Sequence, residues 1–371
     1  MKKISIDVVI PSFRLEENYI VPILQLARPA DAEIRFYVVV DNPAIVPAPA
    51  IKTLIDNEQV FLLINPENKG AAITRNTGLE AGHGDWVLFL DDDILVPDNL
   101  LQTYAHAALQ QPDEAGFIGL INFPPAQTAF TKAIQVSGSM DIFGIAAKKA
   151  SFAWGATANI MVKRSVIGDT RFSTAYPKSG GGEDVDFFLN VREKNAYKDF
   201  RSLPQAAVQH PWWNNDKVNF TRPYRYGKGN SWLGQLNPQY TYYDFFNTPE
   251  TLFLALVAAV ILVIVKPVWV MPVLLFMAGA VLIEIIASAV QALKRDRHSN
   301  VRIMFYVMAL RVVHDTGVLR GKLSRFGFHR IGERFHDNGV RNKLYFYRSN
   351  TYKMIKWVLY PLLVWLIWRG F

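Results

Sequence analysis

The chain has 371 residues, half of them hydrophobic, no cysteine and a net charge of +8. The lack of cysteine excludes disulfides and thiolate metal sites, so a metal ion would need Asp, Glu, His or carbonyl ligands. The charge is unevenly divided: residues 1–290 carry 24 Lys and Arg against 28 Asp and Glu, and residues 291–371 carry 16 against 4. Because the basic part follows the most apolar part, it favours the cytoplasmic surface of an anionic membrane, and no nucleic-acid partner is expected.

The first residues, MKKISIDVVIPSF, resemble a signal peptide only briefly. Asp7 and Pro11 interrupt the apolar run and Arg14 follows it. We therefore expect no signal peptide here, and a catalytic part on the cytoplasmic side.

Five apolar runs between Ser5 and Phe123 predict buried strands: SIDVVIP, EIRFYVVV, VFLLI, DWVLFL and AGFIGLINF. Their nearly continuous apolar character is typical of a parallel sheet covered on both faces. Helix candidates at 18–27, 70–81 and 98–110 alternate with them, and a further one spans 183–193. The pattern predicts an open α/β sheet with right-handed crossovers.

Acidic residues follow two of the predicted strands directly. Asp41 follows the second, and Asp91, Asp92 and Asp93 follow the fourth, within VLFLDDDILV. Ligands bind at the carboxyl ends of strands in such sheets. Three adjacent carboxylates repel one another unless water or a positive charge offsets them. A helix cap and a phosphatase-type D-x-D nucleophile are alternative interpretations, although the latter belongs on a first strand.

From Thr251 to Leu293 only Lys266 and Glu284 are charged. Lys266-Pro267 divides this run into halves near the ~20 residues that a membrane-spanning helix needs, which predicts a helical hairpin. A buried hairpin in a soluble protein is the alternative. Residues 301–313 are predicted to form an interfacial helix or one packed on the hairpin, and 357–368, with Pro361 inside, either dips into the bilayer or lies on it.

The stretch NKGAAITRNTGLEAGHGDWVLFLDDD, residues 68–93, resembles the N-x-G, A-R-N-x-G and D-x-D pattern of family 2 glycosyltransferases. DVVIPSF, VVVDN, Ala158-Asn159 and Gly182-Glu183-Asp184-Val185-Asp186-Phe187 are similar to further family segments, in order, over residues 5–235. The resemblance implies a GT-A type domain over residues 1–240 in the cytoplasm. Residues 241–371 would form the membrane region, with a hairpin at about 251–293 and a basic, amphipathic tail at 294–371.

For the activity, the resemblance implies inverting, metal-dependent transfer of a sugar from a nucleotide-diphosphate sugar to a hydroxyl of a membrane-associated glycan or lipid acceptor, at the inner membrane. Mn²⁺ or Mg²⁺ would be held by Asp91, Asp93 and His210, because a hard cation prefers oxygen ligands and makes the diphosphate a better leaving group. Asp184 would be the general base. The residues expected to contact the donor are Pro11, Ser12, Asp41, Asn68, Arg75, Asp91, Glu183, Arg225 and Lys228.

Several points stay open at this level. The usual D-D-G-S becomes Asp41-Asn42-Pro43-Ala44, so the nucleotide base is undetermined. Gly180 to Gly182 form either a lid or a plain loop. Trp212 and Trp213 either stack on a sugar or anchor the chain at an interface. A polyprenyl-phosphate glycosyltransferase, whose phosphate acceptor needs no base, and a non-catalytic membrane scaffold are the alternative functions.

Overall fold

The computed structural model describes residues 3–178, 181–341, 345–346 and 349–370. The chain divides into two compact units. Unit 1 comprises Met1–Pro125, Asp141–Asn215 and Asp337–Gly339, and unit 2 comprises Ala126–Met140, Asp216–His336 and Val340–Phe371. Gly180 of the predicted lid lies outside the described residues.

Unit 1 is built on an eight-stranded sheet of order β3-β2-β1-β4-β7-β5-β8-β6. β2 pairs in parallel with β1 and β3, β1 with β4, and β5 with β8, whereas β7 is antiparallel to β4 and β5, and β6 is antiparallel to β8. The open, mostly parallel α/β sheet and all five predicted strands are confirmed. The strands are β1 (Ile4–Ser12), β2 (Ala32–Val40), β3 (Val60–Ile64), β4 (Trp86–Leu90), β5 (Gly116–Asn122), β6 (Ser151–Phe152), β7 (Asn159–Lys163) and β8 (Phe200–Gln209).

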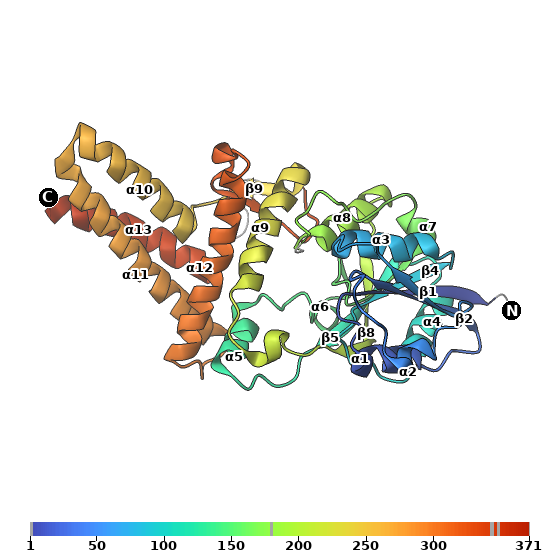
Figure 1. The fold of residues 1–371 in the computed structure, drawn as a ribbon. Coiled ribbons are helices and arrows are strands. Elements are labelled where there is room, and N and C mark those ends of the chain that lie inside the picture. Colours follow the sequence, from blue (N-terminus) through green and yellow to red (C-terminus); the bar gives the residue numbers. More distant parts are fainter. Residues whose placement is uncertain (1–2, 179–180, 342–344, 347–348, 371) are drawn as a thin grey trace. The chain divides into compact units, whose positions relative to one another are not determined.

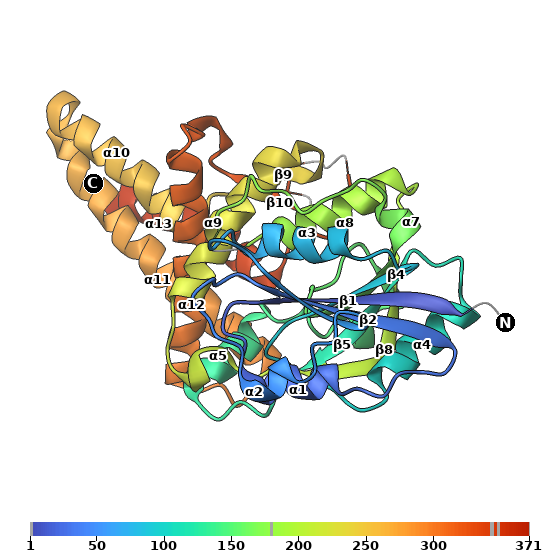
Figure 2. The ribbon, with the colours of Figure 1, turned by 45° about the vertical axis from the view of Figure 1, so that its right-hand side comes forward.

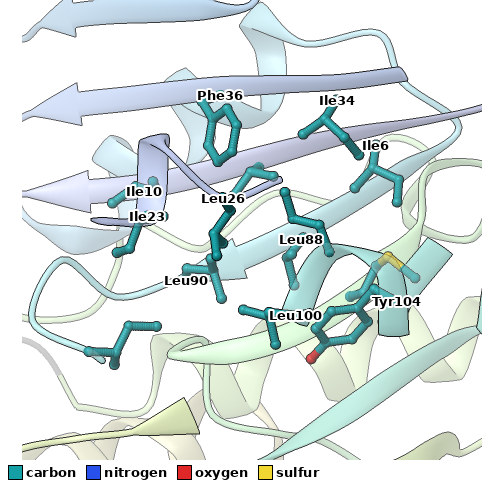
Figure 3. Close-up of a cluster of buried hydrophobic side chains, with 14 of the residues drawn as sticks. Ile6, Ile10, Ile23, Leu26, Ile34, Phe36, Leu88, Leu90, Leu100 and Tyr104 are labelled. Carbon is teal, nitrogen blue, oxygen red and sulfur yellow. The ribbon is translucent and has the colours of Figure 1, made fainter. Parts of the chain in front are cut away.

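Helices cover both faces of this sheet (Figure 2). α3 and α8 lie over one face, and α1, α2 and α4 over the other. The second face holds a buried apolar core in which Ile6 and Ile10 of β1 meet Leu88 of β4 and Leu100 of α4 (Figure 3). The helices of unit 1 are α1 (Glu17–Leu24), α2 (Pro49–Lys52), α3 (Ala71–Ala81), α4 (Leu100–Gln110), α6 (Ile145–Lys148), α7 (Arg164–Ile167) and α8 (Glu183–Lys194).

A buried ion pair explains the glycines that follow α3. The Asp7 carboxylate is almost fully buried, and it accepts hydrogen bonds from Arg164 Nη2 at 2.6 Å and from the Gly84 amide at 2.6 Å. A Cβ atom on Gly82 would lie 2.3 Å from Asp7 Oδ2. The glycine is therefore needed for close approach, since its own φ of −91° suits any residue.

We expect Gly82→Ala to lower the free energy of unfolding by about 3 kcal/mol, because the added methyl must displace a buried, paired carboxylate. Chemical denaturation followed by circular dichroism measures the change. Gly144→Ala is the matched control, because Gly144 has φ −94° and nothing within 4 Å of its added Cβ. Equal stability of the two variants would contradict this account.

Unit 2 is mainly helical (Figure 1). Lys266 separates α10 from α11, so the predicted helical hairpin is confirmed, and among the described residues these two helices are long and apolar enough to cross a membrane. The elements of unit 2 are α5 (Ala129–Ser137), α9 (Thr221–Leu236), η2 (Pro238–Tyr240), β9 (Thr241–Tyr243), α10 (Thr248–Val265), η3 (Pro267–Trp269), α11 (Val270–Arg295), α12 (Val301–Leu323), η4 (Phe328–Arg330), β10 (Glu333–Phe335) and α13 (Thr351–Gly370). The short η1 (Trp213–Asp216) connects the units.

Two glycines bring α9 and α12 into close backbone contact. A Cβ atom on Gly227 would lie 1.9 Å from the His314 carbonyl oxygen, and one on Gly317 would lie 2.2 Å from the Tyr224 carbonyl oxygen. Small residues at a helix crossing permit this approach. Gly227 therefore has a structural role in this crossing. α12 extends beyond the predicted 301–313 and packs on α9 and on the hairpin.

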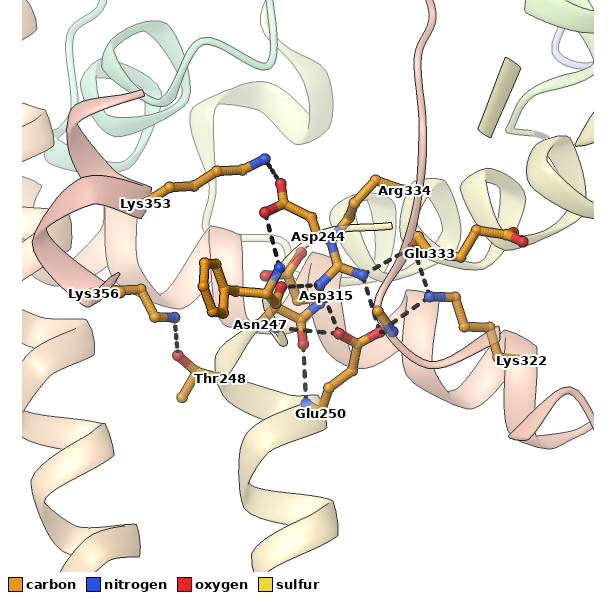
Figure 4. A network of polar contacts seen from close by, with 12 residues as sticks. Asp244, Asn247, Thr248, Glu250, Asp315, Lys322, Glu333, Arg334, Lys353 and Lys356 are labelled. Atoms are coloured by element: carbon orange, nitrogen blue, oxygen red, sulfur yellow. Dashed lines mark hydrogen bonds and ion pairs between the residues drawn. The ribbon is translucent and has the colours of Figure 1, made fainter. Parts of the chain in front are cut away.

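Buried charges hold the hairpin to the helices around it (Figure 4). Glu250 of α10 lies 3.0 Å from Lys322 Nζ and 2.6 Å from Arg334 Nη2. Glu284, the lone acid of the apolar run, lies 2.9 Å from Lys356 Nζ of α13. Because each buried carboxylate has a cationic partner, its burial is tolerated. The 12-residue segment at 357–368 is thus part of a 20-residue helix that packs on α11.

Candidate functional site

The carboxyl ends of β1, β2 and β4 meet at one edge of the sheet, because these strands are parallel neighbours. This edge carries Ser12 at the end of β1, Asp41 just after β2, and Asp91 to Asp93 just after β4. The sequence prediction that the two acidic sites share an edge is confirmed by this topology.

His210 joins the same edge from β8. A backbone bridge between Leu95 and Gln209 (N···O 2.8 and 2.9 Å) ties the segment after β4 to the end of β8. The potential ligand atoms of Asp91, Asp93 and His210 consequently lie within 4.8 Å of one another. The structure therefore brings together the three residues that were expected to bind a metal.

The imidazole of His210 is oriented for a cation. Its Nδ1 lies 2.7 Å from the Pro211 carbonyl oxygen, which can only accept, so Nδ1 carries a proton. In the neutral ring the Nε2 lone pair then faces Asp93 Oδ1 at 3.2 Å. Two hydrogen-bond acceptors 3.2 Å apart repel each other unless a cation lies between them or the ring carries a second proton. Imidazole nitrogen with carboxylate oxygens suits Mn²⁺, so these residues fit such an ion.

Arg75 of α3 connects the aspartates to α8. Its Nη1 lies 3.2 Å from Glu183 Oε1, and its Nη2 lies 3.7 Å from Asp91 Oδ1. The guanidinium also lies over the ring of Phe172, 5.6 Å from the centroid, and its buried Nε has no hydrogen-bond partner among the described residues. The expected pairing of Arg75 with the acidic cluster is present.

Arg14 is a contact that sequence reasoning missed. Its Nη2 donates a hydrogen bond to Asp93 Oδ2 at 3.0 Å, and its Nε lies 3.3 Å from Glu16. The side chain is half exposed. The only signal in the sequence is a cation soon after the first strand, which has no distinctive spacing.

Asp92 lies in the turn after β4 and has a different hydrogen-bond partner from Asp93. Its carboxylate accepts a 2.6 Å hydrogen bond from Ser12 Oγ, which in turn accepts one from the Leu15 amide at 2.9 Å. Burial raises the pKa of Asp92 to about 6, the Ser12 hydrogen bond opposes this, and the Asp93 and Asp91 charges add to it. The Ser12 hydroxyl thus has two protein partners in this structure.

Asp41 caps the amino-terminal end of α3. Its oxygens accept hydrogen bonds from the Lys69 amide at 2.9 Å, the Gly70 amide at 2.8 Å and Asn65 Nδ2 at 2.8 Å. A carboxylate at a helix amino terminus is stabilised by the dipole and has lone pairs left for a ligand. Asn68 is exposed nearby, and Pro11 precedes Ser12 on β1. The nucleotide contacts expected of these residues stay predictions.

Asp184 lies in the first turn of α8, which begins at Glu183 as predicted. Burial, followed by the negative charge of Glu183, raises the pKa of Asp184 to about 7, and the Arg75 charge opposes this. Within unit 1, Glu183 Oε1 lies 3.2 Å from Arg75 Nη1, and Glu183 Oε2 accepts a hydrogen bond from the Gly181 amide at 2.8 Å. Asp184 is half-buried and accepts from the Val185 amide at 2.8 Å. A carboxylate with a pKa near 7 suits a general base.

An aromatic cluster surrounds His210. Trp212 is buried, stacks on Phe123 with ring centroids 4.7 Å apart, and donates from its indole to the Pro124 carbonyl at 2.9 Å. Because the ring is 6% exposed and its N–H is used inside unit 1, Trp212 presents little surface for the suggested stacking on a sugar in this structure. Phe143 and Trp213 also lie against the His210 ring, 6.2 and 5.8 Å between centroids.

Arg225 and Lys228 belong to α9 of unit 2 rather than to a loop of unit 1. Both are half-buried, and Arg225 Nε has no hydrogen-bond partner among the described residues. Their expected contact with the donor diphosphate stays a prediction.

Comparison with known proteins finds a family profile that matches part of the chain. The profile described as "Glycosyl transferase family 2" matches residues 7–168, which include most of β1, all of β2 to β7 and the aspartates after β4. The GT-A like, mostly parallel sheet agrees with that match.

The matches to individual proteins are partial. The chain is 38% identical over 61 residues to an "Uncharacterized glycosyltransferase" of Haemophilus influenzae, which covers 16% of this chain and 24% of that protein. It is 27% identical over 190 residues to "Succinoglycan biosynthesis protein ExoM" of Rhizobium meliloti, covering 49% of this chain and 58% of that protein. The chain thus spans a quarter to somewhat over half of these relatives. A solved structure titled "Crystal Structure of a Mycobacterial Protein" superposes with a TM-score of 0.44 and 11% identity, covering 62% of this chain and 74% of that one.

Proposed function

Because residues 7–168 form a family 2 glycosyltransferase domain, we propose that this enzyme transfers a sugar from a nucleotide-diphosphate sugar to a hydroxyl of a membrane-associated acceptor, with inversion. The observation that carries the proposal is the convergence of Asp91, Asp93 and His210 on one point at the carboxyl edge of the sheet. The match to a succinoglycan biosynthesis protein favours a polysaccharide or lipid-linked glycan as acceptor.

Charge balance supports a divalent ion at this point. Four carboxylates gather there against two guanidiniums among the described residues, namely Asp91, Asp92, Asp93 and Glu183 against Arg14 and Arg75. A bound Mn²⁺ or Mg²⁺ would neutralise the negative charge of the leaving diphosphate. The protein's own residues hold the ligand set: Pro211 orients His210, and Arg75 fixes Asp91 beside α8.

Asp184 is assigned as the base that takes the proton from the attacking hydroxyl. Its pKa near 7 leaves a substantial fraction ionised at neutral pH while keeping it basic enough to accept a proton. Glu183 is unsuited to that role, because Arg75 Nη1 and the Gly181 amide hold its two oxygens. One carboxylate suffices on the acceptor side, unlike the pair that a hydrolase needs.

Membrane attachment through unit 2 supports a membrane-associated acceptor. Apolar side chains of α10 and α11 face outward, for example Ile264 at 83% and Leu282 at 57% exposed. The core helix of a soluble protein would bury such residues. The basic residues of 291–371 follow α11, which agrees with a cytoplasmic placement of that end. We assign the chain to the inner membrane, with the domain of residues 1–240 on its cytoplasmic face.

We expect the full-length protein in detergent to gain thermal stability with one of UDP, GDP, TDP or CMP, and only when Mn²⁺ or Mg²⁺ is present. Ligands that bind the folded state raise its apparent stability by mass action. Differential scanning fluorimetry measures the shift, and chelation of the metal should reverse it. Absence of a shift with every nucleotide would favour the scaffold alternative.

A second arm tests attachment separately. The protein should float with vesicles of phosphatidylcholine alone, since the hairpin buries its apolar faces in any bilayer. Recovery in the soluble fraction would remove the membrane part of the proposal and leave the transferase part intact.

A further inference from the structure

Unit 2 contains a cavity of about 370 Å³ that is lined by residues of unit 2. Its wall includes Lys322, Arg325, His329 and Arg330, and a single carboxylate, that of Glu333. A wall with three permanent cations and one acid attracts anions.

Two of these cations are already paired. Arg330 donates to both oxygens of Glu333, with Nε distances of 3.0 and 3.3 Å. Lys322 Nζ lies 3.0 Å from Glu250 Oε1 and 2.8 Å from the Glu333 carbonyl oxygen (Figure 4). Arg325 is therefore the cation of this wall that has no carboxylate in ion-pair range among the described residues.

Neutral groups hold the Arg325 guanidinium in place. Its Nε donates to the Gly321 carbonyl at 2.8 Å, its Nη2 to Ser231 Oγ at 2.7 Å, and its Nη1 to Gln235 Oε1. It also lies 3.9 Å from the centroid of Trp232. Three of its five N–H donors are thus used by described residues, and two have no partner among them and remain for a ligand. Burial and the nearby Arg330 charge lower the pKa of Arg325 to about 10, and the Glu333 charge opposes this, so the guanidinium stays charged at neutral pH.

Two exposed aromatic residues flank a wall residue of the cavity in the chain, and the wall is linked to the start of the hairpin through Lys322. Phe326 and Phe328, which flank Gly327 of the wall, are 84% and 56% exposed. Glu250, the partner of Lys322, lies in the first turn of α10. Exposed phenylalanines beside basic groups at the end of an apolar helix suit the boundary between lipid headgroups and acyl chains.

We propose that this cavity binds the phosphate group of an anionic phospholipid, with the two remaining donors of Arg325 on the phosphate oxygens and Phe326 and Phe328 beside the glycerol and acyl chains. An arginine fork with two free donors matches a phosphate bidentately. The assignment rests on the proposed membrane attachment but not on sugar transfer.

The test measures binding of three probes to the full chain in detergent by the shift of its thermal unfolding midpoint. The probes are dioctanoyl phosphatidylglycerol, dioctanoyl phosphatidylcholine and inorganic phosphate. In the variant Gln235→Glu a carboxylate replaces the amide that touches Arg325, so Arg325 gains a counter-charge while the same hydrogen bond is kept. Arg320→Gln is the matched control, because it also lowers the net charge by one, but on an exposed side chain of α12.

The expected result is binding of phosphatidylglycerol in preference to phosphatidylcholine, weakened about tenfold or more by Gln235→Glu and unchanged by Arg320→Gln. Equal weakening in the two variants would show non-specific attraction and overturn the assignment to this cavity. Inorganic phosphate bound as tightly as phosphatidylglycerol would overturn the lipid assignment, as would no binding of phosphatidylglycerol. Flotation with phosphatidylcholine vesicles tests membrane attachment independently of these outcomes.

Discussion

Replacing Asp93 with asparagine is expected to abolish the metal-dependent stabilisation by nucleotide and to lower kcat/KM by at least about 100-fold. Mutation of a group that merely supports a metal ligand already costs 10- to 100-fold, and Asp93 is placed to be a ligand itself. Its Oδ1 faces His210 Nε2 at 3.2 Å, so the amide would remove the negative charge next to the ring nitrogen. Fluorimetric titration with Mn²⁺ and nucleotide measures the first effect, and transfer assays the second.

Asp98→Asn is the matched control for Asp93→Asn. Asp98 is an exposed carboxylate five residues further on and lies outside the group formed by Asp91, Asp93 and His210. It should keep the full nucleotide shift. If Asp93→Asn responds to Mn²⁺ and nucleotide as the unmodified enzyme does, the metal site as assigned is wrong, whatever the effect on turnover.

The second large effect is expected for Asp184→Asn, which should lower kcat by about 10²- to 10⁴-fold, the usual contribution of a general base. Nucleotide binding should persist, because the variant leaves Asp91, Asp93 and His210 unchanged. Steady-state transfer assays, with the thermal shift as a binding readout, separate the two. Asp169→Asn removes an exposed carboxylate that pairs with Lys194 and should leave kcat unchanged.

The pH dependence gives a further readout of the same residue. Because the pKa of Asp184 is raised to about 7, kcat should rise with pH up to about 7 and then level off. At pH values between the pKa of Asp184 in the unfolded chain and its raised pKa in the folded protein, the folded protein binds more protons at this carboxylate. The contribution of Asp184 to the free energy of unfolding therefore decreases as pH rises through that range. Asp184→Asn removes this decrease, so the variant should unfold no more easily than the unmodified enzyme above pH 7.

Asp184→Asn also separates the candidate acceptors. A phosphate acceptor needs no base, so a polyprenyl-phosphate glycosyltransferase would keep much of its activity in this variant. Loss of activity with nucleotide binding intact favours a hydroxyl acceptor.

The sequence by itself determined the parts of the molecule that depend on local pattern. Buried strands are continuous apolar runs, and all five that were predicted for the first part of the sheet are present. Their parallel pairing follows from the helices between them, which in turn places Asp41 and Asp91 to Asp93 at one edge. The long apolar run interrupted at Lys266-Pro267 was sufficient to predict the hairpin.

Only the tertiary structure decided which distant residues meet. The family resemblance grouped His210 with Asp93, but the residues alone do not show how they meet: His210 reaches Asp93 because β8 joins the sheet beside β5, a pairing that no local period encodes. Arg14 reaches the same aspartate from the loop after β1, and Asp41 caps α3 through amides that follow β3.

The same holds for the buried charges of unit 2. Glu284 stood out in the sequence as a lone acid in an apolar helix, which indicates that a partner is needed but not that the partner is Lys356. Arg325 appeared as one of many basic residues in the tail. In the folded protein Arg330 and Lys322 pair with carboxylates, whereas the hydrogen-bond partners of Arg325 among the described residues are neutral. Composition records how many charges the chain has, whereas long-range contacts decide which of them remain available to a ligand.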